Sequence, residues 1–139
     1  MILERSNPEH DRVEERMGLE IVAWLTTVNA EGQPQSSPVW FLWDGTSFLV
    51  YSRPGSHKVP NIEENPRVSV TLRGTETGED IAIFEGTAAV SPDVPPADQI
   101  PEYLEKYRDS IRSEGWTPEV FASMYSTPIR VTPTRARIW

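Results

Sequence analysis

The sequence predicts a mainly β domain with minor helices, in which six strands close into a barrel or roll. Short runs of β-branched and aromatic residues alternate with turns rich in glycine, proline and asparagine, and each run has the length of a strand. The 139 residues include 13 prolines and 8 glycines, and the helical segments between the runs are short. Six strands in a flat sheet would leave two exposed edges, which closure into a barrel removes.

We expect a single domain over residues 1–139, because a chain with 37% hydrophobic and 24% charged residues can bury one core. The absence of cysteine excludes disulfides, thiolate metal ligands and a cysteine nucleophile. His10 and His57 are the only histidines, so we expect no metal site. No apolar run approaches the roughly 20 residues of a transmembrane helix, and the charged N-terminus lacks a signal core. We therefore expect a cytoplasmic protein.

The net charge of −8, from 21 acidic and 13 basic residues, argues against nucleic acid and membrane partners. Residues 45–62 and 120–139 nevertheless contain no acidic residue. The basic residues of these two zones are Arg53, His57, Lys58, Arg130, Arg135 and Arg137. Two interpretations of this lack of acidic residues stay open. The two zones can be apolar strands that leave little room for carboxylates, or they can bind an anion.

The first half of the chain begins with a predicted short helix, because Asn7 and Pro8 stand where a cap and a first helical residue belong. Strands are predicted at residues 20–28 and 37–43, on either side of a glycine-containing turn. In the second strand Val39, Phe41 and Trp43 share one face, and Pro38, Trp40 and Leu42 share the other. Asp44-Gly45 predicts a two-residue turn of type I′ into a third strand at residues 48–52.

The middle of the chain returns to a helix and then to strands. Ser56 is predicted to cap a short helix over residues 57–64, which Asn65-Pro66 ends before a strand at residues 67–72. A polar loop at residues 74–79 leads to a fifth strand at residues 81–90. The small residues from Gly86 to Ala89 in this strand predict a bulge or a close backbone approach.

The last third combines two helices and a strand. Ile100, Leu104, Tyr107 and Ile111 recur at spacings of four, three and four, which predicts an amphipathic helix that ends near Gly115. Thr117-Pro118 predicts the start of a second short helix. The sixth strand is predicted at residues 128–139.

The densest group of chemically useful residues runs from Tyr51 to Lys58 and continues to Asn61. It combines a glycine turn, hydroxyls, a predicted helix N-terminus and three basic side chains. Backbone amides at a helix start and cationic side chains bind phosphate, so this segment is a candidate phosphate site. It can equally be an ordinary strand-to-helix connection in which the serine only caps.

The span from Val22 to Leu72 resembles the pyridoxamine-phosphate-oxidase-like split β-barrel family of flavin and deazaflavin proteins. Within it, the pattern Gln-Pro-x-Ser-x-Pro-Val-Trp at residues 33–40 is most similar to the branch that uses the deazaflavin coenzyme F-420. The resemblance implies a six-stranded split β-barrel of the FMN-binding type. It also implies a homodimer, with F-420 or alternatively FMN in the groove between the subunits.

The resemblance assigns site residues as well. The phosphate motif of the family falls on Ser56, His57 and Lys58, with Ser52 and Arg53 before it and Asn61 one helical turn beyond. The backbone that faces the cofactor ring falls on Ser37, Pro38, Val39 and Trp40. His57 stands where the pyridoxamine phosphate oxidases usually have arginine, and their C-terminal arginine and histidine motif is absent. Vitamin B6 oxidation is therefore not expected.

The implied activity is a hydride transfer between the deazaflavin and a small organic electrophile, so no protein nucleophile is required. The proton can come from water, Tyr51 or Tyr125. The segments expected to line the substrate pocket, residues 74–79 and 116–125, carry no motif. Trp40 can stack on a ring or pack in the core, and the C-terminal arginines can form surface pairs or reach the acidic tail of F-420. An FMN enzyme and a non-catalytic (deaza)flavin carrier remain alternatives.

Overall fold

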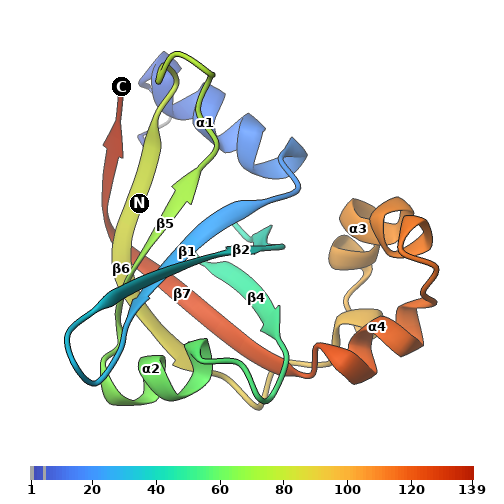
Figure 1. Ribbon diagram of the computed structural model, residues 1–139. Coiled ribbons are helices and arrows are strands. Elements are labelled where there is room, and N and C mark those ends of the chain that lie inside the picture. Colours follow the sequence, from blue (N-terminus) through green and yellow to red (C-terminus); the bar gives the residue numbers. More distant parts are fainter. Residues whose placement is uncertain (1, 5) are drawn as a thin grey trace.

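Seven antiparallel strands form one curled sheet in the computed structural model, which describes residues 2–4 and 6–139 (Figure 1). The strand order is β2-β1-β5-β6-β7-β4-β3. The strands are β1 (Ala23–Val28), β2 (Pro34–Val39), β3 (Leu42–Trp43), β4 (Phe48–Ser52), β5 (Arg67–Leu72), β6 (Ala82–Val90) and β7 (Thr127–Ile138). The helices are α1 (Pro8–Leu19), α2 (Lys58–Glu64), α3 (Pro101–Ser113) and α4 (Pro118–Met124), with a 3-10 turn at Ala97–Gln99.

The sheet curls into a split barrel because its two edge strands are consecutive in sequence. β2 lies at one edge and β3 at the other, and only Trp40 and Phe41 separate them. An extended chain spans at most about 3.6 Å per residue, so the two edges meet at this β2–β3 bend. The predicted mainly β barrel is confirmed.

The predicted number of six strands was wrong, because the expected strand at residues 37–43 is divided between β2 and β3. At the division, Phe41 N donates its hydrogen bond to Tyr107 Oη of α3 at 2.7 Å instead of to a neighbouring strand. The expected alternation of side chains is confirmed. Val39, Phe41 and Trp43 pack in the core inside the barrel, and Trp40 and Leu42 pack in a second cluster outside it.

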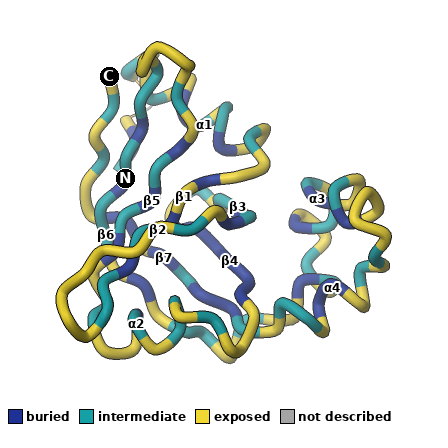
Figure 2. Tube along the Cα trace, viewed as in Figure 1, coloured by how far each residue is buried: buried dark blue, intermediate teal, exposed yellow. Residues whose placement is uncertain are grey.

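β4 forms the wall between these two clusters and is buried along its whole length (Figure 2). Phe48 and Val50 belong to the barrel core, whereas Leu49 and Tyr51 belong to the outer cluster. The outer cluster attaches α3 and α4 to the barrel. None of the helices in the described part of the chain combines the length and apolar character needed to cross a membrane, and α3 has only 13 residues.

Several local predictions are confirmed. β4 and β5 have the predicted bounds. The α1 helix starts as expected, because Asn7 Oδ1 accepts a hydrogen bond from Glu9 N at 3.0 Å and Pro8 follows. α4 starts at Pro118 after the capping residue Thr117. The register shift between Glu85 and Gly86 is the predicted bulge of β6.

Two local predictions were wrong because side chains found other partners. Ser56 does not cap α2; its hydroxyl lies 2.6 Å from Ser52 Oγ, and no side chain caps the helix. The turn after β3 is not of type I′. Asp44 N donates a hydrogen bond to Ser47 O, so the two turn residues are Gly45 and Thr46. Type I′ requires a positive φ at both, and Thr46 lacks it. Burial would raise the pKa of Asp44, but hydrogen bonds from Thr46 and Ser47 lower it below its ordinary value.

Lys106 of α3 is partly buried against the barrel. Its Nζ donates hydrogen bonds to Met17 O at 3.0 Å and to Phe41 O at 2.8 Å. Burial lowers the pKa of Lys106 to about 8 from 10.5, although the charge of Glu20 opposes the shift. At a pH between about 8 and 10.5, Lys106 is protonated to a greater extent in the unfolded chain than in the folded chain. The contribution of Lys106 to the unfolding free energy therefore rises with pH.

We expect this contribution to rise by about 1 kcal/mol between pH 7 and 9. Urea denaturation of the wild-type and Lys106→Met chains across this range measures it, because other titrating groups are common to both. The wild-type chain should gain stability relative to the variant. Parallel pH profiles for the two chains would contradict the expectation.

Tyr103 of α3 is fully buried in the outer cluster, and its hydroxyl has no hydrogen-bond partner among the described residues. Burial raises the pKa of Tyr103 far above its ordinary value. Because an unpaired buried hydroxyl is destabilising, Tyr103→Phe should raise the unfolding free energy by about 1 kcal/mol in urea denaturation. The control is Tyr107→Phe, which removes a bonded hydroxyl from the same helix and should lower it. An equal loss in both variants would mean that Tyr103 is hydrogen-bonded in solution.

Candidate functional site

A cavity of about 420 Å³ opens between the barrel and the α3–α4 hairpin. Its walls come from the ends of β2 and β4, the start of α2, and the hairpin. This volume is within the range of roughly 300–1,000 Å³ that is typical of small-molecule sites. We call it the aromatic cavity; it is lined by Pro38, Val39, Trp40, Tyr51, Ser52, Arg53, Ser56, Lys58, Glu114, Trp116, Phe121 and Tyr125.

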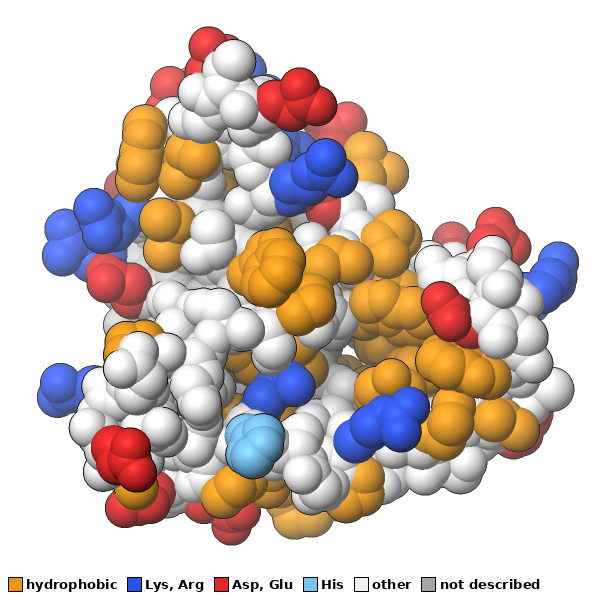
Figure 3. Space-filling view, viewed as in Figure 1, with side chains coloured by type: hydrophobic (Ala, Val, Ile, Leu, Met, Phe, Trp, Pro, Cys, Tyr) orange, Lys and Arg blue, Asp and Glu red, His pale blue; other side chains and the backbone are white. Residues whose placement is uncertain are grey.

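One end of the aromatic cavity is basic and rich in hydroxyls. This basic end consists of Ser52, Arg53, Ser56 and Lys58, which the end of β4, the turn after it and the start of α2 bring together. The turn is closed by a hydrogen bond from Ser56 N to Arg53 O at 3.1 Å, and the Ser52 and Ser56 hydroxyls are 2.6 Å apart. Figure 3 shows basic side chains in blue beside hydrophobic ones in orange, between α2 and α4.

The two cations of the basic end have no anionic partner within the described part of the chain. No carboxylate forms a salt bridge with Arg53 or Lys58, although acidic residues outnumber basic ones. Lys58 is partly buried, and this burial lowers its pKa because the charged form loses hydration. An anion placed beside Lys58 would offset that cost, so the basic end has the chemistry of an anion site.

The other end of the cavity is a wall of stacked aromatic rings. Trp40 stacks on Tyr107 at 4.8 Å and on Phe121 at 5.3 Å between ring centres, and Phe121 stacks on Tyr125 at 4.9 Å. The Arg53 guanidinium lies 5.0 Å from the centre of the Tyr125 ring and so links this wall to the basic end. A flat, largely apolar group with an anionic substituent fits such a lining. Trp40 is partly buried against the outer cluster and also lines the cavity, so stacking of Trp40 on a ligand ring stays a prediction.

Seven of the ten predicted site residues line the aromatic cavity. They are Pro38, Val39, Trp40, Ser52, Arg53, Ser56 and Lys58. The three others do not line it. Ser37 lies within β2, and His57 is exposed at the start of α2. Asn61 donates hydrogen bonds to Thr27 Oγ1 at 3.0 Å and to Gln35 Oε1 at 2.9 Å, which tie α2 to β1 and the start of β2. A cofactor role for these three residues stays a prediction.

Tyr51 and Tyr125, the two candidate proton donors, both line the cavity. The Tyr51 hydroxyl donates a hydrogen bond to Pro95 O at 2.5 Å, and burial raises the pKa of Tyr51 to about 12, a shift that Arg130 opposes. Its proton is therefore both engaged and hard to remove.

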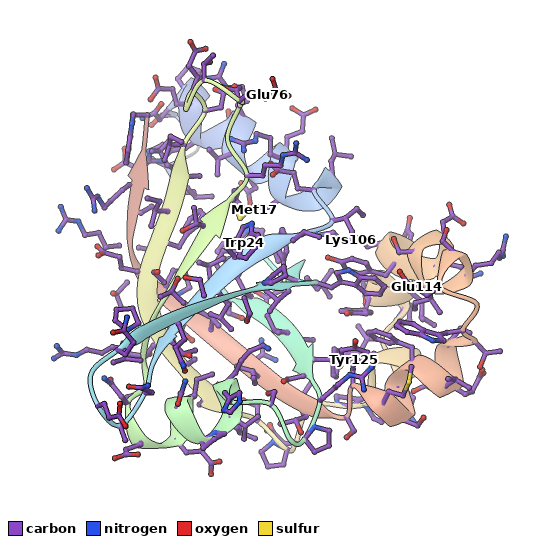
Figure 4. The ribbon with its side chains drawn as sticks, viewed as in Figure 1. Met17, Trp24, Glu76, Lys106, Glu114 and Tyr125 are labelled. Atoms are coloured by element: carbon purple, nitrogen blue, oxygen red, sulfur yellow. The ribbon has the colours of Figure 1, made fainter. Side chains whose placement is uncertain are left out.

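The α3–α4 hairpin supplies the lining residues that the sequence did not single out. Glu114 is an exposed residue at the end of α3 and Phe121 is a buried residue of α4, and no local signal distinguishes either from residues without a role in a site. Of the two segments expected to line the substrate pocket, residues 116–125 contribute Trp116, Phe121 and Tyr125 to the aromatic cavity, whereas the loop at residues 74–79 contributes nothing to it. Figure 4 shows Glu76, at the tip of that loop, far from Tyr125.

The three C-terminal arginines also lie outside the aromatic cavity. Arg130 is 3.1 Å from the Asp44 carboxylate, and Arg135 is 3.9 Å from the Glu85 carboxylate. Arg137 packs over the ring of Trp139 at 5.6 Å. These contacts favour the interpretation of the arginines as surface pairs, because each guanidinium has a partner on the barrel.

The structure is a split β-barrel with a cavity at its outer wall that is basic at one end and aromatic at the other. The sequence model described as "Pyridoxamine 5'-phosphate oxidase" matches residues 10–139. The chain therefore belongs to the pyridoxamine 5'-phosphate oxidase family. A comparison with curated protein sequences found no significant match.

Solved structures with the same fold include proteins of differing description. A conserved hypothetical protein from Mycobacterium tuberculosis superposes with a TM-score of 0.72 at 24% identity, over 93% of this chain and 82% of that one. An F-420 reductase gives 0.66 at 24% identity, over 89% and 94% of the two chains. The haem storage protein HutZ from Vibrio cholerae gives 0.66 at 18% identity, over 92% of each chain. At these identities the similarity shows the fold alone.

Proposed function

We propose that the chain is an oxidoreductase that binds coenzyme F-420 and transfers a hydride between this deazaflavin and a small organic electrophile. The observation that carries the proposal is the aromatic cavity, in which two cations without carboxylate partners among the described residues lie beside a hydroxyl pair and an aromatic wall. Family membership supports a flavin-type cofactor. The sequence pattern at residues 33–40 supports the deazaflavin in particular, and an F-420 reductase is among the proteins that share the fold.

The residues present fit such a cofactor. Arg53 and Lys58 would neutralise its phosphate, and the hydroxyls of Ser52 and Ser56 would donate hydrogen bonds to it. The backbone of Pro38 to Trp40 would receive the flat ring system. When bound, the deazaflavin supplies the hydride chemistry.

The remaining lining residues act on the environment of the reaction. The wall of Trp40, Phe121 and Tyr125 excludes water from the ring and offers a flat surface to an apolar substrate. Because the Tyr51 proton is engaged, we assign the protonation of the substrate to water.

We also propose that the protein is a homodimer. β2 is an edge strand with one unpaired side, and the adjoining segment exposes 38% of Ile21, 36% of Val22 and 46% of Trp24. Trp24 lies directly opposite Pro38 in the sheet register, and Pro38 lines the aromatic cavity. A second copy on this surface would cover the apolar side chains and bring its own residues to the cavity. Sedimentation that shows a monomer at micromolar protein would contradict the dimer.

The charge supports the remaining assignments. A net charge of −8 repels polyanions, so we propose a small-molecule substrate and no nucleic acid or membrane partner. We also propose that the protein is cytoplasmic.

The decisive experiment titrates the cofactor-free protein with F-420, FMN and haem in parallel and follows tryptophan fluorescence. Micromolar or tighter affinity for F-420 alone supports the proposal and justifies a screen of hydride acceptors. Preference for FMN would assign the protein to the FMN-dependent oxidases or reductases, and preference for haem would contradict both. Tight F-420 binding without turnover on any acceptor would favour a carrier.

A further inference from the structure

Two neighbouring residues of α3, Lys106 and Tyr107, form hydrogen bonds with the backbone of the β2–β3 bend. Phe41 N donates a hydrogen bond to Tyr107 Oη at 2.7 Å, and the same hydroxyl lies 2.7 Å from Ile21 O and 3.0 Å from Phe41 O. Lys106 Nζ donates to Phe41 O at 2.8 Å and to Met17 O at 3.0 Å. Figure 4 shows Lys106 reaching toward the barrel from α3. These contacts join the bend to the end of α1 and to the segment before β1.

The bonds meet a requirement of the backbone. Phe41 is fully buried and belongs to neither β2 nor β3, so no strand pairs with its N–H and C=O. A buried backbone group without a partner is strongly unfavourable. Lys106 and Tyr107 supply both partners from 65 and 66 residues away.

Tyr107 also supports a side chain that lines the aromatic cavity. Its ring stacks on Trp40 with 4.8 Å between the ring centres and an angle of 8° between the planes. Trp40 lines the cavity, whereas neither Tyr107 nor Lys106 does. Tyr107 and Lys106 therefore lie outside the cavity lining, and Tyr107 packs against Trp40, which is part of that lining.

We propose that Tyr107 and Lys106 are positioning residues of the ligand site, which fix the β2–β3 bend and thereby hold Trp40 and the end of β2 where the planar part of a ligand binds. This inference rests on the proposed function of the aromatic cavity. The pair makes no hydrogen bond with Ser52, Arg53, Ser56 or Lys58. It acts on the planar part of the ligand and leaves the binding of the anionic part unchanged.

The test compares two probes on the same variant. Tyr107→Phe keeps the ring and removes the hydroxyl, and it should lower the affinity for F-420 about tenfold, the usual effect of one lost hydrogen bond. The affinity for inorganic pyrophosphate, which can use only the basic end, should not change. Partial unfolding of the variant would lower the apparent affinities for F-420 and for pyrophosphate together. A loss for F-420 alone therefore indicates that Tyr107 positions the site for the planar part of the ligand. Equal affinities of variant and wild type for F-420, or an equal loss for both probes, would overturn the proposal.

Tyr103→Phe is the matched control, because it removes a hydroxyl from the same helix and the same cluster that has no partner there. It should leave both affinities unchanged. Lys106→Met is the second variant and should act in the same direction as Tyr107→Phe.

A measurement without ligand separates this proposal from the proposed function. The indole N–H signal of Trp40 in a ¹⁵N spectrum, assigned with Trp40→Phe, should shift in Tyr107→Phe and in Lys106→Met but not in Tyr103→Phe. If the wild-type protein binds neither F-420 nor FMN, the proposed function fails, and the Trp40 signal still decides the positioning. An unchanged Trp40 signal in Tyr107→Phe and Lys106→Met would overturn the positioning role of these two residues.

Discussion

Lys58→Ala is expected to weaken cofactor binding by about 1.5–3 kcal/mol, or roughly 10- to 150-fold in Kd. Lys58 is partly buried at the basic end of the aromatic cavity, and no carboxylate of the described chain pairs with it. The protein without ligand therefore bears the cost of a poorly hydrated ammonium, which lowers the pKa of Lys58. A bound phosphate offsets that cost with a charge-assisted hydrogen bond, and alanine removes the bond.

The measurement is a fluorescence titration with F-420, in wild-type and variant protein of equal folded content. His57→Ala is an informative partner, because the family resemblance places His57 in the phosphate motif whereas the structure leaves its side chain exposed and outside the cavity lining. We expect a smaller loss for His57→Ala than for Lys58→Ala. Arg130→Ala serves as the control with no effect on affinity, since Arg130 is paired with Asp44 away from the cavity.

An unchanged Kd for folded Lys58→Ala would remove the basic end from the binding site. Equal losses for Lys58→Ala and His57→Ala would instead mean that His57 turns toward the ligand on binding. The first outcome would overturn the site assignment, and the second would restore the full motif that the resemblance predicts.

The sequence predicted the helices and strands that are determined by residues close to one another in the chain. The bounds of β4 and β5 follow from runs of apolar and β-branched residues between turns. The two faces of residues 37–43 follow from the two-residue period of an extended chain. The break at Phe41 could not be predicted, because its cause is the Tyr107 hydroxyl on a helix 66 residues later.

The candidate site shows the same division between local and distant causes. Ser52, Arg53, Ser56 and Lys58 lie close in sequence and meet in space, as predicted. Asn61 was expected to face the phosphate because it lies one helical turn from Lys58. In the structure its amide donates hydrogen bonds to Thr27 and Gln35, whose positions depend on how the strands pair, and no local pattern predicts these bonds. Apart from Trp40, the aromatic wall comes from the α3–α4 hairpin, where a residue that lines a cavity has the same sequence pattern as one that only packs.

Gly86→Ala is expected to lower the unfolding free energy by about 1–3 kcal/mol, the usual effect of overpacking. Gly86 lies at the bulge of β6, where the strand lies very close to its paired neighbour β7. A methyl group on Gly86 would overlap Thr132 O and come within 2.7 Å of Pro133 Cα. Both contacts are with backbone atoms, so no side-chain rotation can relieve them, and β7 itself must move.

Gly18→Ala is the matched control, because the same methyl group meets nothing within 4 Å there. Gly18 lies within α1, where alanine is favoured over glycine by about 0.5–1 kcal/mol, so this variant should be more stable than the wild type. Urea denaturation of the two variants measures the difference, and the opposite signs separate steric overlap from a general effect of replacing glycine. If Gly86→Ala were as stable as the wild type, the bulge would have to open in solution, and the close approach of β6 to β7 at this point would not be needed to close the barrel.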